Sequence, residues 1–181
     1  MLTKARKQKT DRIKKVVAHL FDRVGAKKAG NADDFIRLYF ERVAPEDINP
    51  VPIENLYGAA MSLRGFATQR KSGGAKIRVF NPSVDAEGWQ TGHTVIEIIN
   101  DDMPFLVDSI TNGLNEEGFT VLLAVHPIVR VKRSAAGRLS ASATSISSLD
   151  GYDDESWMHV EIAAQSSPAV LKDIDKLLHR I

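Results

Sequence analysis

The chain has 181 residues, with 24 Lys and Arg against 23 Asp and Glu, and 43% of its residues are hydrophobic. This composition is typical of a soluble globular protein with one ordinary domain or two small ones, and its balanced charge gives no bulk attraction for nucleic acid. The absence of Cys excludes disulfides, thiolate metal sites and a cysteine nucleophile. No apolar run approaches the roughly 20 residues of a membrane span, and the N-terminus lacks a signal-peptide core. We therefore expect a cytoplasmic protein without a membrane partner.

The first fifteen residues are strongly basic, since seven Lys and Arg face a single acidic residue, Asp11. A basic tail of this kind can be a nucleic-acid footprint. However, no aromatic residues interleave the charges and no DNA-binding motif follows them. A solvated helix face is therefore the favoured interpretation, and nucleic-acid binding through residues 4–15 stays as a weaker alternative.

Apolar residues recur at helical spacing in several stretches of the first part of the chain. One stretch ends near Gly25. A second begins after Asn31, which is a good N-cap, with Asp34 at the matching capping-box position. A third covers about 53–70 and is followed by a Ser-Gly-Gly break. The sequence therefore predicts a helical N-terminal segment over residues 1–72.

After this break the pattern changes to the alternation of β-strands, which predicts an α+β domain over residues 73–181. From residue 93 onward the order is strand, helix, strand, strand, helix, which is a ferredoxin-like, or ACT-like, unit without its last strand. The strand at 75–80 is predicted to fill that place in an antiparallel sheet, as in a circular permutation, with helices on one face. The Ser- and Ala-rich stretch 138–151 is predicted to be mobile. The expected strands are 76–80, 93–99, 119–133 and 156–164, and the expected helices are 103–117 and the segment after Pro168.

Strand alternation sorts the side chains of this sheet into two faces. One face is expected to meet the helices through Ile96, Ile98, Val121, Leu123, Val125, Val129, Val131, Met158, Val160 and Ile162. The opposite face is expected to carry Val95, Glu97, Leu122, His126, Ile128, Trp157, His159 and Glu161. This second face is too apolar to be left in water, so either the N-terminal helices or another subunit should cover it.

The second face also holds side chains of the types that bind metals or transfer protons, namely Glu97, His126, His159 and Glu161. Their spacing matches no metal-binding motif, so a salt-linked or interface cluster is favoured over a metal site. The sequence also lacks the glycine-rich loops that hold nucleotide phosphates and the motifs that surround a nucleophilic serine. We therefore predict no catalytic, cofactor-binding or metal-binding residue in these 181 residues.

The stretch from residue 100 to 109 joins a predicted strand to a predicted helix and is the strongest local signal in the chain. Asp101 and Asp102 are placed to cap the helix. The alternative is an effector pocket, where helix amides would hold a carboxylate and the aspartates would suit an amino group. Asp108 and Asn112 lie on the polar side of the helix, within reach of a partner subunit. The candidate effector or interface residues are Asp101, Asp102, Asp108, Asn112, His126, Trp157, His159 and Glu161.

Several runs of residues resemble the N-terminal region of the large bacterial NAD-dependent glutamate dehydrogenases, from about residue 35 to the end. These runs are NLYGAA at 55–60, RVFNP at 78–82, HTVIEI at 93–98, the segment 100–109, HP at 126–127 and ESWMHVEI at 155–162. Their order and spacing follow the family pattern, whereas the first thirty residues match weakly.

This resemblance implies a parent enzyme that oxidatively deaminates L-glutamate to 2-oxoglutarate and ammonia with NAD. The family's catalytic and nucleotide-binding domains lie outside the matched region, and its N-terminal part is similar to ACT-type domains, which serve regulation and subunit association. The chain is therefore expected to be a non-catalytic regulatory and oligomerisation region without a cofactor of its own. Its expected partners are the rest of the parent chain and the other subunits of a homo-oligomer. An amino-acid-sensing module with its pocket at the 100–105 corner is the alternative.

Overall fold

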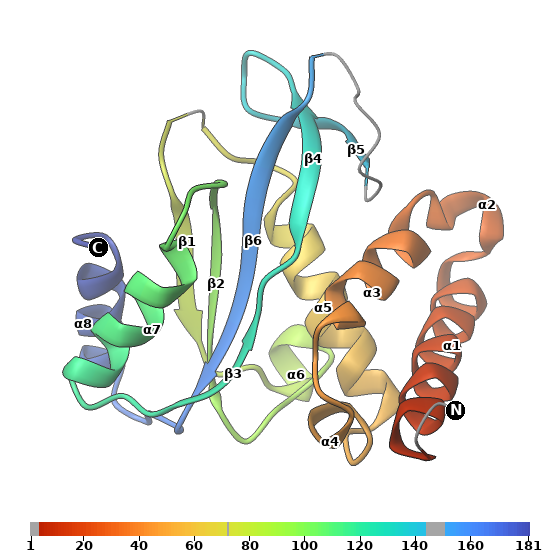
Figure 1. Cartoon of the computed structure of the whole chain (residues 1–181), viewed down its shortest axis with the longest axis horizontal. Coiled ribbons are helices and arrows are strands. Elements are labelled where there is room, and N and C mark those ends of the chain that lie inside the picture. Colours follow the sequence, from red (N-terminus) through yellow and green to blue (C-terminus); the bar gives the residue numbers. More distant parts are fainter. Residues whose placement is uncertain (1–3, 72, 144–150) are drawn as a thin grey trace.

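The computed structural model describes residues 4–71, 73–143 and 151–181, and Figure 1 shows a sheet between two groups of helices. The first five helices lie on one side of the sheet, and α7 and α8 lie on the other. The helices are α1 (Lys4–Val24), α2 (Ala26–Ala29), α3 (Ala32–Glu41), α4 (Pro45–Ile48), α5 (Ile53–Phe66), α6 (Val84–Glu87), α7 (Leu106–Glu116) and α8 (Pro168–Leu178). The strands are β1 (Lys76–Phe80), β2 (Thr94–Asp101), β3 (Val121–Val125), β4 (Ile128–Arg133), β5 (Leu139–Ala143) and β6 (Asp153–Ile162).

The sheet has the strand order β1-β2-β6-β4-β5, and β3 also pairs with β6. All of these pairings are antiparallel. In the ferredoxin-like order the missing fourth strand would lie beside the first, and β1 lies there, with Arg78 opposite Glu97 of β2. The predicted α+β, ACT-like fold and its circularly permuted edge are therefore confirmed.

A bulge at Leu122 changes which face the long strand presents. Val121 is opposite Ile162, but Leu123 is opposite Glu161, so one extra residue is inserted between them. This insertion turns Leu123 and the apolar residues after it toward the N-terminal helices, because side chains alternate along a strand. The prediction that Leu123, Val125, Val129 and Val131 face the same side as Val121 is therefore wrong. The register then stays constant through Pro127, whose carbonyl accepts a hydrogen bond from Trp157 N (3.0 Å).

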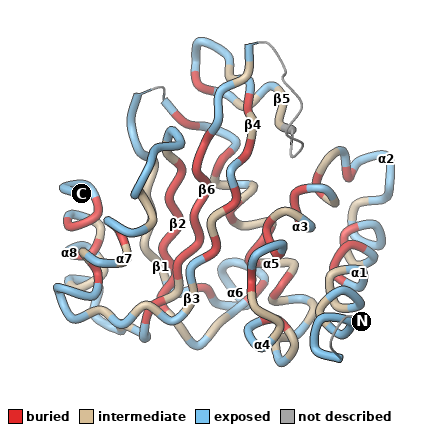
Figure 2. Tube along the Cα trace, in the orientation of Figure 1, coloured by how far each residue is buried: buried red, intermediate tan, exposed pale blue. Residues whose placement is uncertain are grey.

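Two apolar cores lie on opposite sides of the sheet, and the central strands β2 and β6 are buried along most of their length (Figure 2). On one side α7 and α8 supply Ile110, Leu114 and Ile174. On the other side the rings of Phe35 and Trp157 are 5.3 Å apart. The sequence predicted that either the N-terminal helices or another subunit cover this second face, and the structure shows that the chain's own helices do so. Helices therefore lie on both faces of the sheet.

Two of the basic residues in the N-terminal helix hold other helices rather than facing only solvent. The Lys9 amine donates to the carbonyls of Glu41 (2.9 Å) and Val43 (2.5 Å), just past the end of α3. The Arg12 guanidinium donates to the carbonyls of Ile48 and Val51 around the end of α4. Both side chains therefore donate to carbonyls at or just after the ends of α3 and α4, where few intrahelical donors remain.

Two local predictions in the first half of the fold differ from the structure. Asn31 precedes α3 but makes no side-chain cap bond. Its amide instead donates to Ser142 and accepts from Arg64 Nη2 (2.9 Å), which ties α3 and α5 to the sheet edge. The stretch predicted to be mobile contains β5, paired with β4, and its remaining residues 144–150 lie outside the described residues.

Two glycines of α5 offer a matched test of this packing. A Cβ on Gly58 would lie 2.2 Å from the Trp89 Cβ, whereas a Cβ on Gly65 would meet nothing within 4 Å. We expect Gly58→Ala to lower the free energy of unfolding by roughly 1–3 kcal/mol, because Trp89 must move. Gly65→Ala should raise it by roughly 0.5–1 kcal/mol, because alanine favours the helix. Urea unfolding of both variants measures the difference, and equal effects would contradict this packing.

Candidate functional site

The strand-to-helix corner is built differently from the predicted helix cap. Helix α7 begins at Leu106 and its N-cap, Phe105, makes no side-chain cap bond. Asp101 instead accepts from Arg70 Nη1 (2.8 Å), and Asp102 accepts from the Ser156 hydroxyl (2.7 Å). The predicted capping role of the two aspartates is therefore wrong, because both carboxylates bind groups from neighbouring segments before the helix starts.

The apolar residues of this corner point into solvent. Phe105 is 78% exposed and Met103 is 45% exposed. Phe105 also has a φ of 66°, a left-handed conformation that is costly for a non-glycine residue by roughly 1–3 kcal/mol. An exposed aromatic ring on a strained backbone is unusual in a purely structural turn, so the corner stays a candidate contact site.

The strongest polar cluster of the described chain surrounds Glu155, which is 2% exposed. Arg133 donates to both of its carboxylate oxygens at 2.7 Å, and Arg70 donates to one of them at 2.7 Å. The Trp157 indole N–H donates to it as well (2.9 Å). Burial alone would raise the pKa of Glu155, but these hydrogen bonds from Arg133, Trp157 and Arg70 hold it below its ordinary value. The carboxylate is therefore fully used in holding the fold together.

A second chain of hydrogen bonds joins His126, Ser156 and Asp102. His126 Nε2 lies 2.8 Å from the Ser156 hydroxyl, which itself donates to Asp102. Burial lowers the pKa of His126, although the Asp102 carboxylate acts in the opposite direction. Because the serine proton points to the aspartate and Ser156 is fully buried, this arrangement does not activate a nucleophile.

A third cluster lies near the start of β2 and the end of β6. Glu161 lies 2.5 Å from His93 Nδ1 and 3.2 Å from His159 Nε2, and accepts from the Thr91 hydroxyl at 3.1 Å. Burial raises the pKa of this carboxyl, but hydrogen bonding and charge from His159, with His93 and Thr91, lower it to about 2. Glu161 is therefore ionised at neutral pH and acts as the anion between two imidazoles.

Glu97 lies opposite His159 on the same face and is fully buried. One of its oxygens accepts from Arg78 Nε (2.8 Å), and Arg78 Nη2 donates to the Ser62 hydroxyl (2.6 Å). The other oxygen, like His159 Nδ1, has no hydrogen-bond partner. Of the four groups expected to share this face, Glu97, His159 and Glu161 do so, whereas His126 belongs to the Ser156 chain described above.

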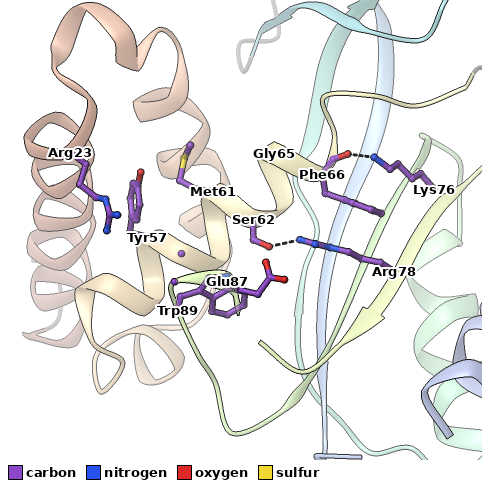
Figure 3. Close-up of a pocket in the computed structure, with 12 residues that line it drawn as sticks. Arg23, Tyr57, Met61, Ser62, Gly65, Phe66, Lys76, Arg78, Glu87 and Trp89 are labelled. Atoms are coloured by element: carbon purple, nitrogen blue, oxygen red, sulfur yellow. Dashed lines mark hydrogen bonds between the residues drawn. The ribbon is translucent and has the colours of Figure 1, made fainter. Parts of the chain in front are cut away.

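A cavity of about 510 Å³ lies beside this cluster, between α5, β1 and the α6 turn. Figure 3 shows Lys76 and Arg78 reaching toward α5 from β1, with Tyr57 and Met61 along the helix and Arg23 beyond them. The volume falls in the range of roughly 300–1,000 Å³ that small-molecule sites occupy. Sequence reasoning missed this cavity because it depends on how α5 docks on β1.

The remaining predicted site residues lie apart from the cavity. Asp108 and Asn112 are exposed on α7, whereas Trp157 and His159 are buried under the N-terminal helices. No group of three or more His, Cys, Asp or Glu residues that could hold a metal occurs in the ranges that the structure describes. Among the same residues, no helix is long and apolar enough to cross a membrane.

The third cluster makes a prediction for pH dependence. Since the pKa of Glu161 is about 2 when folded against an ordinary 4.5, its stabilisation is present above pH 4.5 and is lost as pH falls toward 2. Glu161→Gln should therefore lower the free energy of unfolding by about 3 kcal/mol at pH 7 and by less than half of that at pH 3. Urea unfolding at both pH values measures this, with Glu116→Gln, an exposed position on α7, as control. An equal loss at both pH values would contradict the ionised cluster.

Comparison with known proteins adds a separate line of evidence. A profile of the family described as "Glutamate dehydrogenase, ACT1 domain" matches residues 35–178. A protein named NAD-specific glutamate dehydrogenase from Halomonas elongata is 34% identical over 168 residues, and one of the same name from Pseudomonas aeruginosa is 26% identical over 159 residues. These alignments cover 93% and 88% of this chain but 10% of each relative. The chain therefore spans about a tenth of the length of these curated relatives, and no solved structure matches it.

Proposed function

The chain belongs to the glutamate dehydrogenase ACT1-domain family, and on this premise we propose that it is a non-catalytic regulatory and oligomerisation region of an NAD-dependent glutamate dehydrogenase. The parent enzyme oxidatively deaminates L-glutamate to 2-oxoglutarate and ammonia, and its catalytic domains bind the NAD. A cytoplasmic location belongs to the same proposal.

The observation that carries this proposal is that the chain aligns with only a tenth of the length of much longer dehydrogenases. It also lacks the sequence motifs of catalytic and nucleotide-binding sites. The 181 residues contain no glycine-rich loop for a dinucleotide phosphate. Within the described residues, the acid–base side chains around Glu155 and Ser156 are hydrogen-bonded to one another, and Glu161 is held between His93 and His159, so these groups serve as structural links. A supporting role in a larger enzyme fits these facts better than catalysis.

We assign the assembly contact to the exposed corner before α7. Met103 and Phe105 are large apolar side chains left in solvent there, and the exposed Asp108 and Asn112 lie on the helix that follows. Interfaces commonly place aromatic and Met side chains at their centre and polar groups at the rim. The face that holds Trp157 is unsuitable for this role, because the chain's own helices cover it.

An amino-acid effector at the 100–105 corner is the second candidate function. Asp102 is exposed at this corner and its carboxylate is of the right charge for an ammonium group. Nucleic-acid binding has less support, since Lys9 and Arg12 of the basic helix are engaged by backbone carbonyls.

The catalytic half of the proposal predicts that the 181-residue chain produces no NADH from L-glutamate and NAD. The absorbance of NADH measures this, with the full-length enzyme as the positive control. Turnover by the isolated chain would overturn the proposal.

Calorimetry of the same chain with the twenty amino acids tests the effector alternative. If it holds, one amino acid should give heat of binding that disappears in the Asp102→Asn variant.

The assembly half predicts that Phe105→Ser combined with Met103→Ser weakens subunit association of the full-length enzyme at least tenfold, as expected for central apolar contacts. Light scattering across a dilution series measures the association. The control is Val84→Ser, which removes from α6 an apolar side chain whose exposure (56%) lies between those of Met103 and Phe105, and it should leave association unchanged. Unchanged assembly in the double variant would remove the corner from the interface.

A further inference from the structure

The cavity between α5, β1 and α6 carries an excess of positive charge. Arg23, Lys76 and Arg78 line it, against the single acid Glu87. Arg78 is paired with the buried Glu97 (2.8 Å), but within the described ranges neither Arg23 nor Lys76 lies within 4.0 Å of a carboxylate, so these two supply the uncompensated charge. Cations that outnumber the acids favour an anion there, most strongly at low ionic strength, because the cavity is open to solvent.

The two cations from β1 pack against the same aromatic ring, that of Phe66, which also lines the cavity. Lys76 and Arg78 are two residues apart on a strand, so both side chains leave the same face. The Lys76 amine lies 4.2 Å and the Arg78 guanidinium 4.9 Å from the centre of the Phe66 ring. Lys76 gives one hydrogen bond to the Phe66 carbonyl (2.7 Å) and keeps two N–H donors for another acceptor. Burial first, and then the charges of Arg78 and Arg133, lower the pKa of Lys76, and a bound anion would relieve this.

The rest of the wall is mostly apolar, with the hydroxyl of Ser62 among it, and it is open to solvent. Tyr57, Met61 and Phe66 line it from α5, and Gly65 adds bare backbone with nothing within 4 Å of its Cβ position. Arg23 lies 5.6 Å from the centre of the Tyr57 ring and closes the far end. A flat apolar group can pack against Tyr57 and Met61, while Lys76 and Arg78 at the β1 end of the cavity fix its orientation.

From this geometry we propose that the cavity binds a small organic anion, a carboxylate or a phosphate joined to a planar apolar group. Lys76 and Arg78 hold the anionic group, and Tyr57 and Met61 hold the apolar part. The site is separate from the 100–105 corner, since none of those residues lines it. Its use as a regulatory site rests on the proposed function above, whereas binding itself rests on the cavity alone.

The test uses calorimetry of the 181-residue chain with simple probes of the two halves of the ligand. Phenylacetate and phenyl phosphate carry both halves and distinguish a carboxylate from a phosphate. Phenylacetamide removes the charge, benzylammonium reverses it, and acetate removes the ring. At least one of the first two probes should bind at least tenfold more tightly than all three of the others. Equal binding of phenylacetamide, or no binding of either aromatic anion at 10 mM, on the order of the weakest useful ligand affinities, would overturn the proposal.

Opposite charge changes at the pocket give the sharper readout. Lys76→Met keeps the apolar stem and should weaken the better probe about tenfold or more, as the loss of a charged hydrogen bond does. Glu87→Gln removes the opposing charge of the exposed α6 residue and should strengthen binding roughly two- to fivefold at low salt. If both substitutions changed the affinity for the probe in the same direction, the cavity would not be recognising the negative charge of the probe.

A size change separates this cavity from any other site on the chain. Gly65→Leu places a side chain in open space and should abolish binding, whereas Gly65→Ala should leave affinity within about twofold. Thermal unfolding confirms that each variant is folded. Binding that survives Gly65→Leu would place the probe elsewhere and overturn the proposal. Loss of this site would leave the assembly test of the full-length enzyme and the turnover test of the isolated chain unaffected, so the two proposals fail separately.

Discussion

The fold depends on one buried carboxylate held between two guanidinium groups. Glu155 of β6 accepts from Arg70, which follows α5, and from Arg133, which ends β4, so three distant segments meet at its two oxygens. Removing these charges from water costs several kcal/mol per ion, and such a cluster stabilises only when geometry and hydrogen bonding are nearly complete. The hydrogen bonding here is nearly complete, since Arg133 also donates to the carbonyls of Ala67 and Gly137. A Cβ on Gly137 would lie 2.0 Å from the Arg70 carbonyl oxygen, so only glycine allows this closure.

The position of the cavity follows from this constraint. Arg70 fixes the end of the α5 connection against β6, and the chain then turns directly into β1, which brings Lys76 and Arg78 under α5. The opposite end of α5 is fixed by contact of Gly58 with Trp89. Between these two fixed ends the helix carries Gly65 and the side chains of Met61 and Ser62 toward the strand. The cavity is therefore bounded mainly by a helix and a strand, with the α6 turn on another side, and the two rigid elements favour a preformed site.

Periodicity was sufficient to predict the elements that bury a continuous apolar stripe or face. The three longer helices of the N-terminal segment and the strands β1, β2 and β6 follow from it, whereas the short helices α2 and α4 were not predicted. The permuted place of β1 follows from the order of the elements instead. The bulge at Leu122 could not be predicted, because a run of Val, Leu and Ala satisfies either phase of a strand. The roles of Asn31 and Asp101 were wrong for a different reason. Each is a good local cap, but Ser142 and Arg70, far away in the sequence, offer competing partners that only the folded chain brings near.

The two faces of the sheet differ in a way that bears on regulation. The face under α7 and α8 is almost wholly apolar, whereas the face under the N-terminal helices contains Glu97, His159 and Glu155 among its aromatic rings. Of these groups, Glu155 binds Arg70, which follows α5, so a shift of that helix would break a buried ion pair, whereas an apolar contact tolerates small shifts. A ligand held by α5 and β1 would contact both layers of that interface. The ligand would stabilise the state in which the N-terminal helices are packed on the sheet, relative to a state in which they are displaced. The size of this effect is set by the difference between the ligand's affinities for the two states. Arg78, which binds Glu97 in the interface and lines the cavity, is the residue through which that difference would arise.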